Sequence, residues 1–144
     1  MIKLTELKLN KIRKIISVDI NGEEKNITIY NPIGKKRVLL MDKIRNLSVD
    51  NELSEEDKKN KLYKTVLEEL TDIKVNTKKF EDIEKYPNKA FLEVNSEVMD
   101  IIYELQLEHL YEAKRGLNEQ VIRTLTALNL KKAKELADLM NEVL

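Results

Sequence analysis

The first third of the chain alternates apolar and polar residues over two short segments. Apolar residues occupy every second position over residues 16–20 and again over residues 27–30. Asn21-Gly22 lies between them, and both residue types readily adopt the positive φ angles of a tight turn. The pattern predicts a β-hairpin whose turn type stays open. The leucines of residues 4–9 either add a third strand or begin a short helix.

After the hairpin, apolar residues recur at the three- and four-residue spacing of amphipathic helices. Asn31 is a favourable N-cap with Pro32 at the first helical position, and Ser54 is a favourable N-cap for the next helix. Residues 71–90 are the least patterned part of the chain, and Tyr86-Pro87-Asn88 indicates a break there.

The last third of the sequence predicts two further helices. Asn95 or Ser96 suits the N-cap of the first, and Gly116-Leu117-Asn118 suits a corner before the second. Two helices joined by a short corner pack as an antiparallel hairpin.

The fold class that follows is α+β and mostly α, with an N-terminal β-hairpin of two or three strands followed by helices. We expect an N-terminal α+β part over residues 1–75, a linker over residues 76–90 and a C-terminal helical hairpin over residues 91–144.

Composition excludes several kinds of chemistry. The 144 residues contain no Cys and one His, which excludes disulfides, thiolate metal sites and most zinc sites. A Ser-His-Asp arrangement has no support from a single His, and the three glycines form no nucleotide-binding motif. We therefore expect a non-enzyme without metal or cofactor. Because the start of the chain lacks an apolar signal region and no apolar run reaches about 20 residues, we expect a cytoplasmic protein with no membrane partner.

Charge is unevenly distributed along the chain. Lys plus Arg and Asp plus Glu both number 26, so the formal net charge is zero. Residues 1–47 carry 11 basic and 5 acidic side chains, and the remainder carries the compensating acidic excess. The overall balance disfavours nucleic acid as a partner, whereas the basic start can orient a partner. Gly34-Lys35-Lys36-Arg37 is a candidate anion-binding segment within it, with a solvated helix face as the favoured alternative.

Six acidic residues follow one another at spacings of 4, 3, 4, 4 and 4 and therefore line one helix face. A solvated face is the favoured interpretation, and a docking surface for a basic partner segment is the functional alternative. The acidic row comprises Glu93, Glu97, Asp100, Glu104, Glu108 and Glu112.

The same helix has an apolar arc wider than one neighbouring helix covers, because Met99, Tyr103 and Leu107 lie beside its main apolar stripe. A wide apolar helix face indicates association with another protein chain more than binding of a small ligand.

Residues 91–106 read FLEVNSEVMDIIYELQ. This acidic and apolar run, with its Ile-Ile pair, aromatic residue and final Glu-Leu-Gln, resembles the helical part of tail assembly chaperones from long-tailed phages and prophages. The resemblance covers about residues 90–144, and the small size and absence of Cys agree with it.

The resemblance implies a non-enzymatic chaperone in the host cytoplasm that binds a helical tape-measure protein until tail-tube subunits polymerise around it. Self-association is a second use of the same surface. No catalytic residue and no cofactor are implied. The expected partner contacts are the apolar residues Val98, Ile101, Ile102, Tyr103 and Leu105, with Glu97, Asp100, Glu104 and Glu108 as an acidic rim.

Two alternative functions follow from other features. One is a structural phage component, such as a connector or tail-completion protein. The other is a nucleic-acid-associated regulator that uses the basic N-terminal region.

Overall fold

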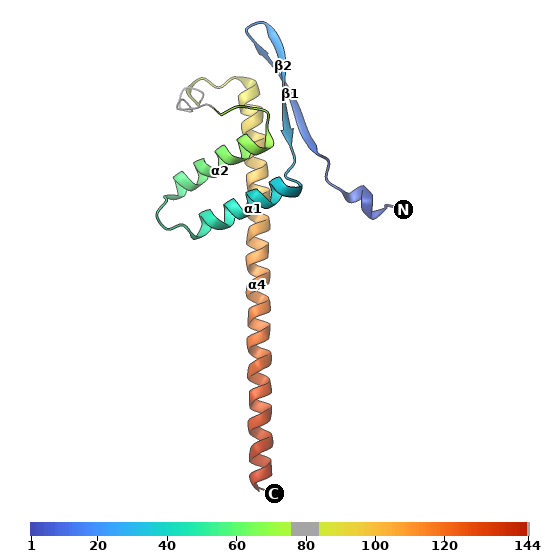
Figure 1. Cartoon of the computed structure of the whole chain (residues 1–144), viewed down its shortest axis with the longest axis vertical. Coiled ribbons are helices and arrows are strands. Elements are labelled where there is room, and N and C mark those ends of the chain that lie inside the picture. The colour runs from blue at the N-terminus through green and yellow to red at the C-terminus, as the bar shows by residue number, and fades with distance from the viewer. Residues whose placement is uncertain (76–83, 144) are drawn as a thin grey trace. The chain divides into compact units, whose positions relative to one another are not determined.

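The computed structural model describes residues 1–75 and 84–143. Its chain divides into two compact units, Met1–Leu107 and Glu108–Leu144. The first unit contains the β-hairpin, two helices and the start of a third helix (Figure 1). This architecture confirms the predicted α+β, mostly α class. Most of the predicted linker, residues 76–83, lies outside the described residues.

The hairpin consists of β1 (Ile12–Ile20) and β2 (Glu23–Tyr30). The two strands pair antiparallel, with Ile20 opposite Glu23 next to the turn. Asn21 and Gly22 have φ angles of 54° and 83°, so both occupy the left-handed region that a two-residue hairpin turn of the primed type requires. The predicted hairpin is confirmed, and its turn is the short one. The N-terminal leucines form a single 3-10 turn, Leu4–Leu7, and not a third strand.

Two helices of equal length follow, α1 (Gly34–Val49) and α2 (Glu55–Leu70). The predicted cap at Ser54 is confirmed, because its Oγ accepts a hydrogen bond from the backbone N–H of Asp57 at 3.1 Å. The predicted cap at Asn31 is wrong. Its buried side chain instead donates to the carbonyl oxygen of Asn10 at 2.7 Å and joins the residue after β2 to the chain before β1.

The core of the first unit lies between one face of the hairpin, the facing sides of α1 and α2, and the first turns of α4 (Lys89–Val143). Ile29, Leu40, Leu70 and Ile101 are fully buried in it. Burial of each such side chain stabilises the fold by about 1.5–3 kcal/mol, which a two-stranded hairpin needs because it is marginal alone. An isolated bridge from Ile29 to Thr71 ties β2 to the end of α2.

Helix α4 begins earlier than the sequence predicts, and it replaces both helices of the predicted C-terminal hairpin. Its cap is Asn88, whose Oδ1 accepts the N–H of Phe91 at 2.7 Å, and not Asn95 or Ser96. Where a corner was predicted, the helix continues through Gly116, which lacks the positive φ of Gly22 and Gly34. Because a helical glycine costs only about 1 kcal/mol, strong helix formers on both sides keep the segment helical.

Candidate protein-binding surface

Arg13 is the centre of an ion cluster inside the first unit. Its Nε donates to Glu97 Oε2 at 2.9 Å, while Nη1 and Nη2 donate to the two carboxylate oxygens of Glu104 at 3.0 and 2.8 Å. The register of the hairpin is irregular between Ile12 and Lys14, at Arg13 itself. A bulge of this kind redirects a side chain, and here the guanidinium meets α4. The cluster therefore attaches the hairpin to α4.

The electrostatic effects of this cluster are reciprocal. The hydrogen bonds that Arg13 donates to Glu104, and then to Glu97, raise the pKa of Arg13 above its ordinary value, while burial opposes them. The hydrogen bond from Arg13 lowers the pKa of Glu104, against a smaller opposing effect of burial. Both shifts favour the charged pair, whose bidentate geometry is the stronger form of Arg–carboxylate contact.

The substitution Glu104→Gln should therefore lower the stability of the protein less at acidic pH than at neutral pH. Because the folded protein holds the pKa of Glu104 below its unfolded value, the stabilisation is present above the unfolded pKa and is lost as pH falls through the folded one. Urea unfolding of Glu104→Gln and of the unsubstituted protein should differ at pH 7, and the difference should shrink as the pH falls below the ordinary pKa of a glutamate. In an Arg13→Ala background the substitution should lose this pH dependence, and a persistent dependence would contradict the assignment.

The expected apolar contacts fall into two groups in the structure. Four of them, Val98, Ile101, Ile102 and Leu105, are buried in the core of the first unit. They cannot offer surface to a partner while this unit is folded, because the chain's own helices cover them. Tyr103, by contrast, is 68% exposed. The apolar stripe is a packing face covered by this chain itself, so these four residues are not available as the expected partner contacts in the folded unit.

The expected acidic rim is also divided. Glu97 and Glu104 bond Arg13, and Lys14 Nζ lies 3.6 Å from the second oxygen of Glu97. Asp100 is exposed, and Glu108 is half-buried at the start of the second unit. Part of the acidic row thus docks a basic segment, as the functional alternative required, but that segment is β1 of the same chain.

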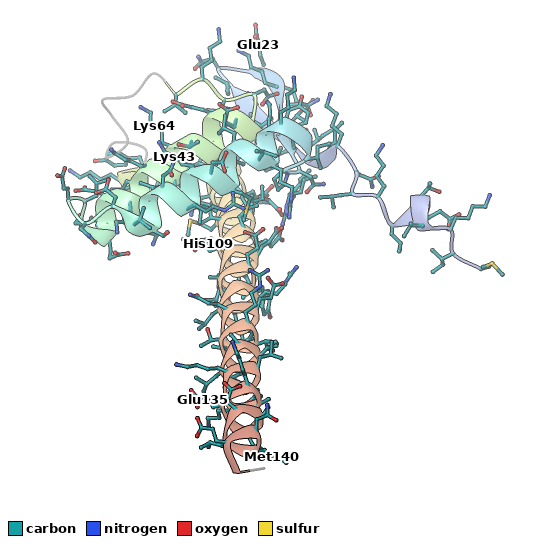
Figure 2. All side chains as sticks on the ribbon, turned by 60° about the horizontal axis from the view of Figure 1, so that its bottom comes forward. Glu23, Lys43, Lys64, His109, Glu135 and Met140 are labelled. Atoms are coloured by element: carbon teal, nitrogen blue, oxygen red, sulfur yellow. The ribbon has the colours of Figure 1, made fainter. Side chains whose placement is uncertain are left out.

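The large exposed apolar surface lies further along α4, in the second unit. Every residue from Ala113 to Glu142 is exposed, and Glu135 and Met140 both project from the helix (Figure 2). Leu125 is 54% exposed, close to the values of its apolar neighbours. We call one set of these residues the apolar row: Leu110, Leu117, Val121, Leu125, Leu128, Leu136 and Leu139.

The sequence predicts a helical hairpin for this segment, in which the apolar residues would cover one another. The informative signal is their spacing. Together with Lys114 and Lys132, the row follows steps of 4, 3, 4, 4, 3, 4, 4 and 3 from Leu110 to Leu139. Such a series repeats every 11 residues and keeps one face of a continuous helix, without a corner.

The basic N-terminal region is partly engaged within the first unit. Besides the Arg13 cluster, Lys36 donates to the carbonyl oxygen of Glu69 at 2.6 Å, and the Lys11 ammonium lies 6.0 Å from the centre of the Tyr30 ring. These contacts reduce the cationic surface available for nucleic acid.

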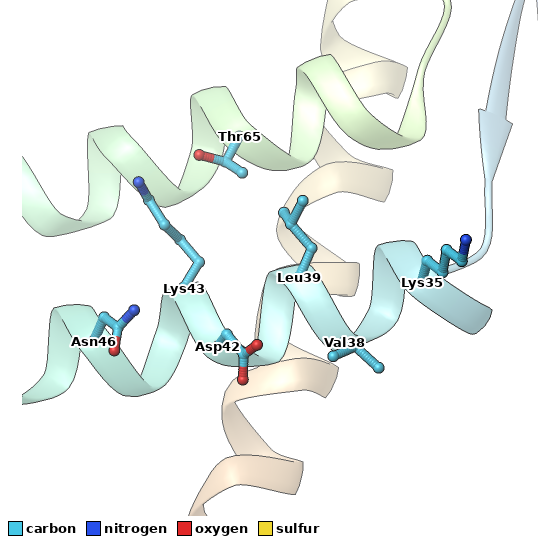
Figure 3. Close-up of a pocket in the computed structure, with 7 residues that line it drawn as sticks. All are labelled: Lys35, Val38, Leu39, Asp42, Lys43, Asn46 and Thr65. Carbon is cyan, nitrogen blue, oxygen red and sulfur yellow. The ribbon is translucent and has the colours of Figure 1, made fainter.

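A shallow hollow of about 550 Å³ lies between α1 and α2 (Figure 3). Lys43 extends across it towards Thr65, and Val38 and Leu39 form its apolar part. Its one acid, Asp42, forms a 2.8 Å ion pair with Arg45. The acid that lines the hollow is therefore already paired with a cation.

Two features are absent from the described residues. No three His, Cys, Asp or Glu side chains come together there as a metal-binding group. In the same ranges, no helix has both the length and the apolar character that crossing a membrane demands.

Comparison with protein-family models, curated proteins and solved structures gave no significant match.

Proposed function

We propose that this protein is a non-enzymatic assembly chaperone of the phage tail type, which binds a long helical client of the tape-measure kind. The observation that carries the proposal is the exposed apolar row of α4. The row takes the place of the buried residues Val98, Ile101, Ile102 and Leu105 as the client-binding surface, with Tyr103 as an additional exposed aromatic residue.

A helical client fits this surface by its chemistry. A row of leucines along more than two dozen residues of helix offers periodic apolar contacts to another helix laid beside it. Residues 108–143 carry six basic and six acidic side chains, so the segment neither attracts nor repels a client by net charge. Recognition then rests on apolar surface and spacing, which suits a long client with many similar helical segments.

The fold supports a chaperone role in a second way. The first unit buries its own apolar residues and fixes the hairpin to α4 through Arg13, so it is stable without a client. The row contributes nothing to that core. A client can therefore arrive and leave without unfolding the rest of the protein.

The test is co-expression with a recombinant helical segment of a phage tape-measure protein that precipitates when produced alone. The unsubstituted chain should keep the segment in the soluble fraction and co-purify with it. Leu125→Lys/Leu128→Lys should abolish both effects, because two apolar side chains at the middle of the row are replaced by hydrated charges.

The matched control is Thr126→Lys/Ala127→Lys, which adds the same charges at the same height on the side of α4 away from the row. It should retain client binding. Equal loss in both variants, or a segment that stays insoluble with the unsubstituted chain, would contradict the proposal. Presence of the protein in purified particles would instead support a structural component, and DNA binding that falls steeply with salt would support a regulator.

A further inference from the structure

The apolar row has a symmetry that a client does not explain. Its steps of 4, 3, 4, 4, 3, 4, 4 and 3, extended by the step of 4 to Val143, read the same from either end. Residues whose numbers add up to 253 therefore occupy equivalent positions of the row: Leu117 with Leu136, Val121 with Lys132, and Leu125 with Leu128. A helix with this arrangement matches a second copy of itself running in the opposite direction.

We propose that the free protein forms a homodimer in which residues 108–143 of α4 pair antiparallel with the same segment of a second copy, centred between Thr126 and Ala127. In this register each apolar layer of one helix meets an apolar or lysine-bearing layer of the other. The 11-residue repeat predicts that the two helices coil about each other with a right-handed twist.

Lys114 and Lys132, which lie on the same helix face as the apolar row, select the antiparallel arrangement. In a parallel, in-register pair, Lys114 would face Lys114 and Lys132 would face Lys132, which brings like charges together twice. In the antiparallel register Lys114 faces Leu139, and Lys132 faces Val121. The aliphatic stems then cover apolar surface while the ammonium groups reach water.

The area available is that of a stable dimer. Beyond the seven residues of the row, Tyr111, Ile122 and Met140 are also exposed along its flank. Covering these ten side chains on each of two copies removes on the order of 1,000–1,600 Å² from water, which overlaps the roughly 1,200–2,000 Å² of stable protein interfaces. Net charge does not oppose the association of two copies, because residues 108–143 carry six charges of each sign.

Sedimentation equilibrium of the full chain tests the association. A dimer with a Kd in the micromolar range or below is expected for an interface of this size. Leu125→Lys/Leu128→Lys should weaken it at least about 100-fold, because in the antiparallel register the new lysines of one copy face those of the other. Thr126→Lys/Ala127→Lys should sediment like the unsubstituted protein. A monomer at all concentrations would overturn the proposal.

Cysteine cross-linking tests the direction, and the chain is well suited to it because it contains no Cys. Residues 117 and 136 are separated by about 28 Å along one helix, so they cannot bond within a chain. Under oxidising conditions Leu117→Cys alone and Leu136→Cys alone should give no covalent dimer. A mixture of the two variants should give one. A covalent dimer of Leu117→Cys alone would indicate the parallel arrangement and overturn the antiparallel one.

The dimer rests on the same surface as the proposed function, and these experiments distinguish the failure of one proposal from the failure of the other. A monomeric chain that still keeps the tape-measure segment soluble overturns the dimer and leaves the function. A dimer that never binds the segment overturns the function and leaves the dimer. If both hold, client and second copy compete for the apolar row, and added client segment should convert the dimer into a one-to-one complex.

Discussion

Replacing Ile101 with alanine is expected to lower the free energy of unfolding of the first unit by about 2–5 kcal/mol. Ile101 is 0% exposed and lies in the core cluster beside residues of α1, α2 and β2. Truncation leaves a cavity that close-packed neighbours refill only in part, so the lost transfer energy and the cavity add. Urea denaturation followed by amide exchange in α2 measures the effect within this unit.

Tyr103→Ala is the matched control for Ile101→Ala, two residues further along the same helix. Its side chain projects into solvent, so the change in stability should stay within about 0.5 kcal/mol. The pair also separates core packing from partner contact as the role of the apolar residues in this part of α4. If Ile101→Ala left stability unchanged but reduced client binding, that residue would be a contact residue and the core described for the first unit would be incorrect.

Arg13→Ala should give the second large effect, a loss of about 1.5–3 kcal/mol in the stability of the first unit. The Arg13 side chain is only 19% exposed, and its removal leaves Glu97 at 21% exposure with Lys14 as its remaining cation. Glu104 is more exposed, so solvent screens part of its attraction to Arg13. Thermal or urea unfolding at pH 7 provides the measurement.

Arg45→Ala provides the comparison for Arg13→Ala, since Arg45 forms a 2.8 Å ion pair with Asp42 on the exposed side of α1. Exposed pairs contribute about 0–1 kcal/mol, so this variant should remain near the stability of the unsubstituted protein. Equal losses for the two variants would mean that Arg13 acts as an ordinary surface cation. Loss of the hairpin's protection from amide exchange in Arg13→Ala alone would show that the cluster fixes β1.

The parts of the fold that depend on neighbouring residues could be predicted from the sequence. Asn21-Gly22 gave the hairpin because its two residues accept positive φ, and Ser54 gave the start of α2 because its hydroxyl reaches the N–H of Asp57. Each of these features rests on an interaction between residues at most three positions apart. The balance of strand and helix follows from the same short-range patterns.

The parts that depend on distant residues could not be predicted. Nothing in the local sequence distinguishes Arg13 from the neighbouring lysines, yet it bonds residues 84 and 91 positions away. The stripe through Val98 and Ile101 indicated burial, but it did not indicate whether this chain or a partner would cover it. The sequence predicts a corner at Gly116 because glycine tolerates several backbone conformations, whereas the surrounding helix formers decide which one it adopts.

Helix α4 also has a consequence for how the protein loses its structure. Its residues up to Leu107 are held by a core, whereas its residues from Glu108 onwards belong to a unit with none of those contacts. Without a second copy, such a helix depends on its own hydrogen bonds and is marginal in water, so in the monomer the two stretches of one helix melt with different cooperativity. Heating the chain at concentrations where it is monomeric should therefore produce two transitions, and a single melting temperature would average two different stabilities.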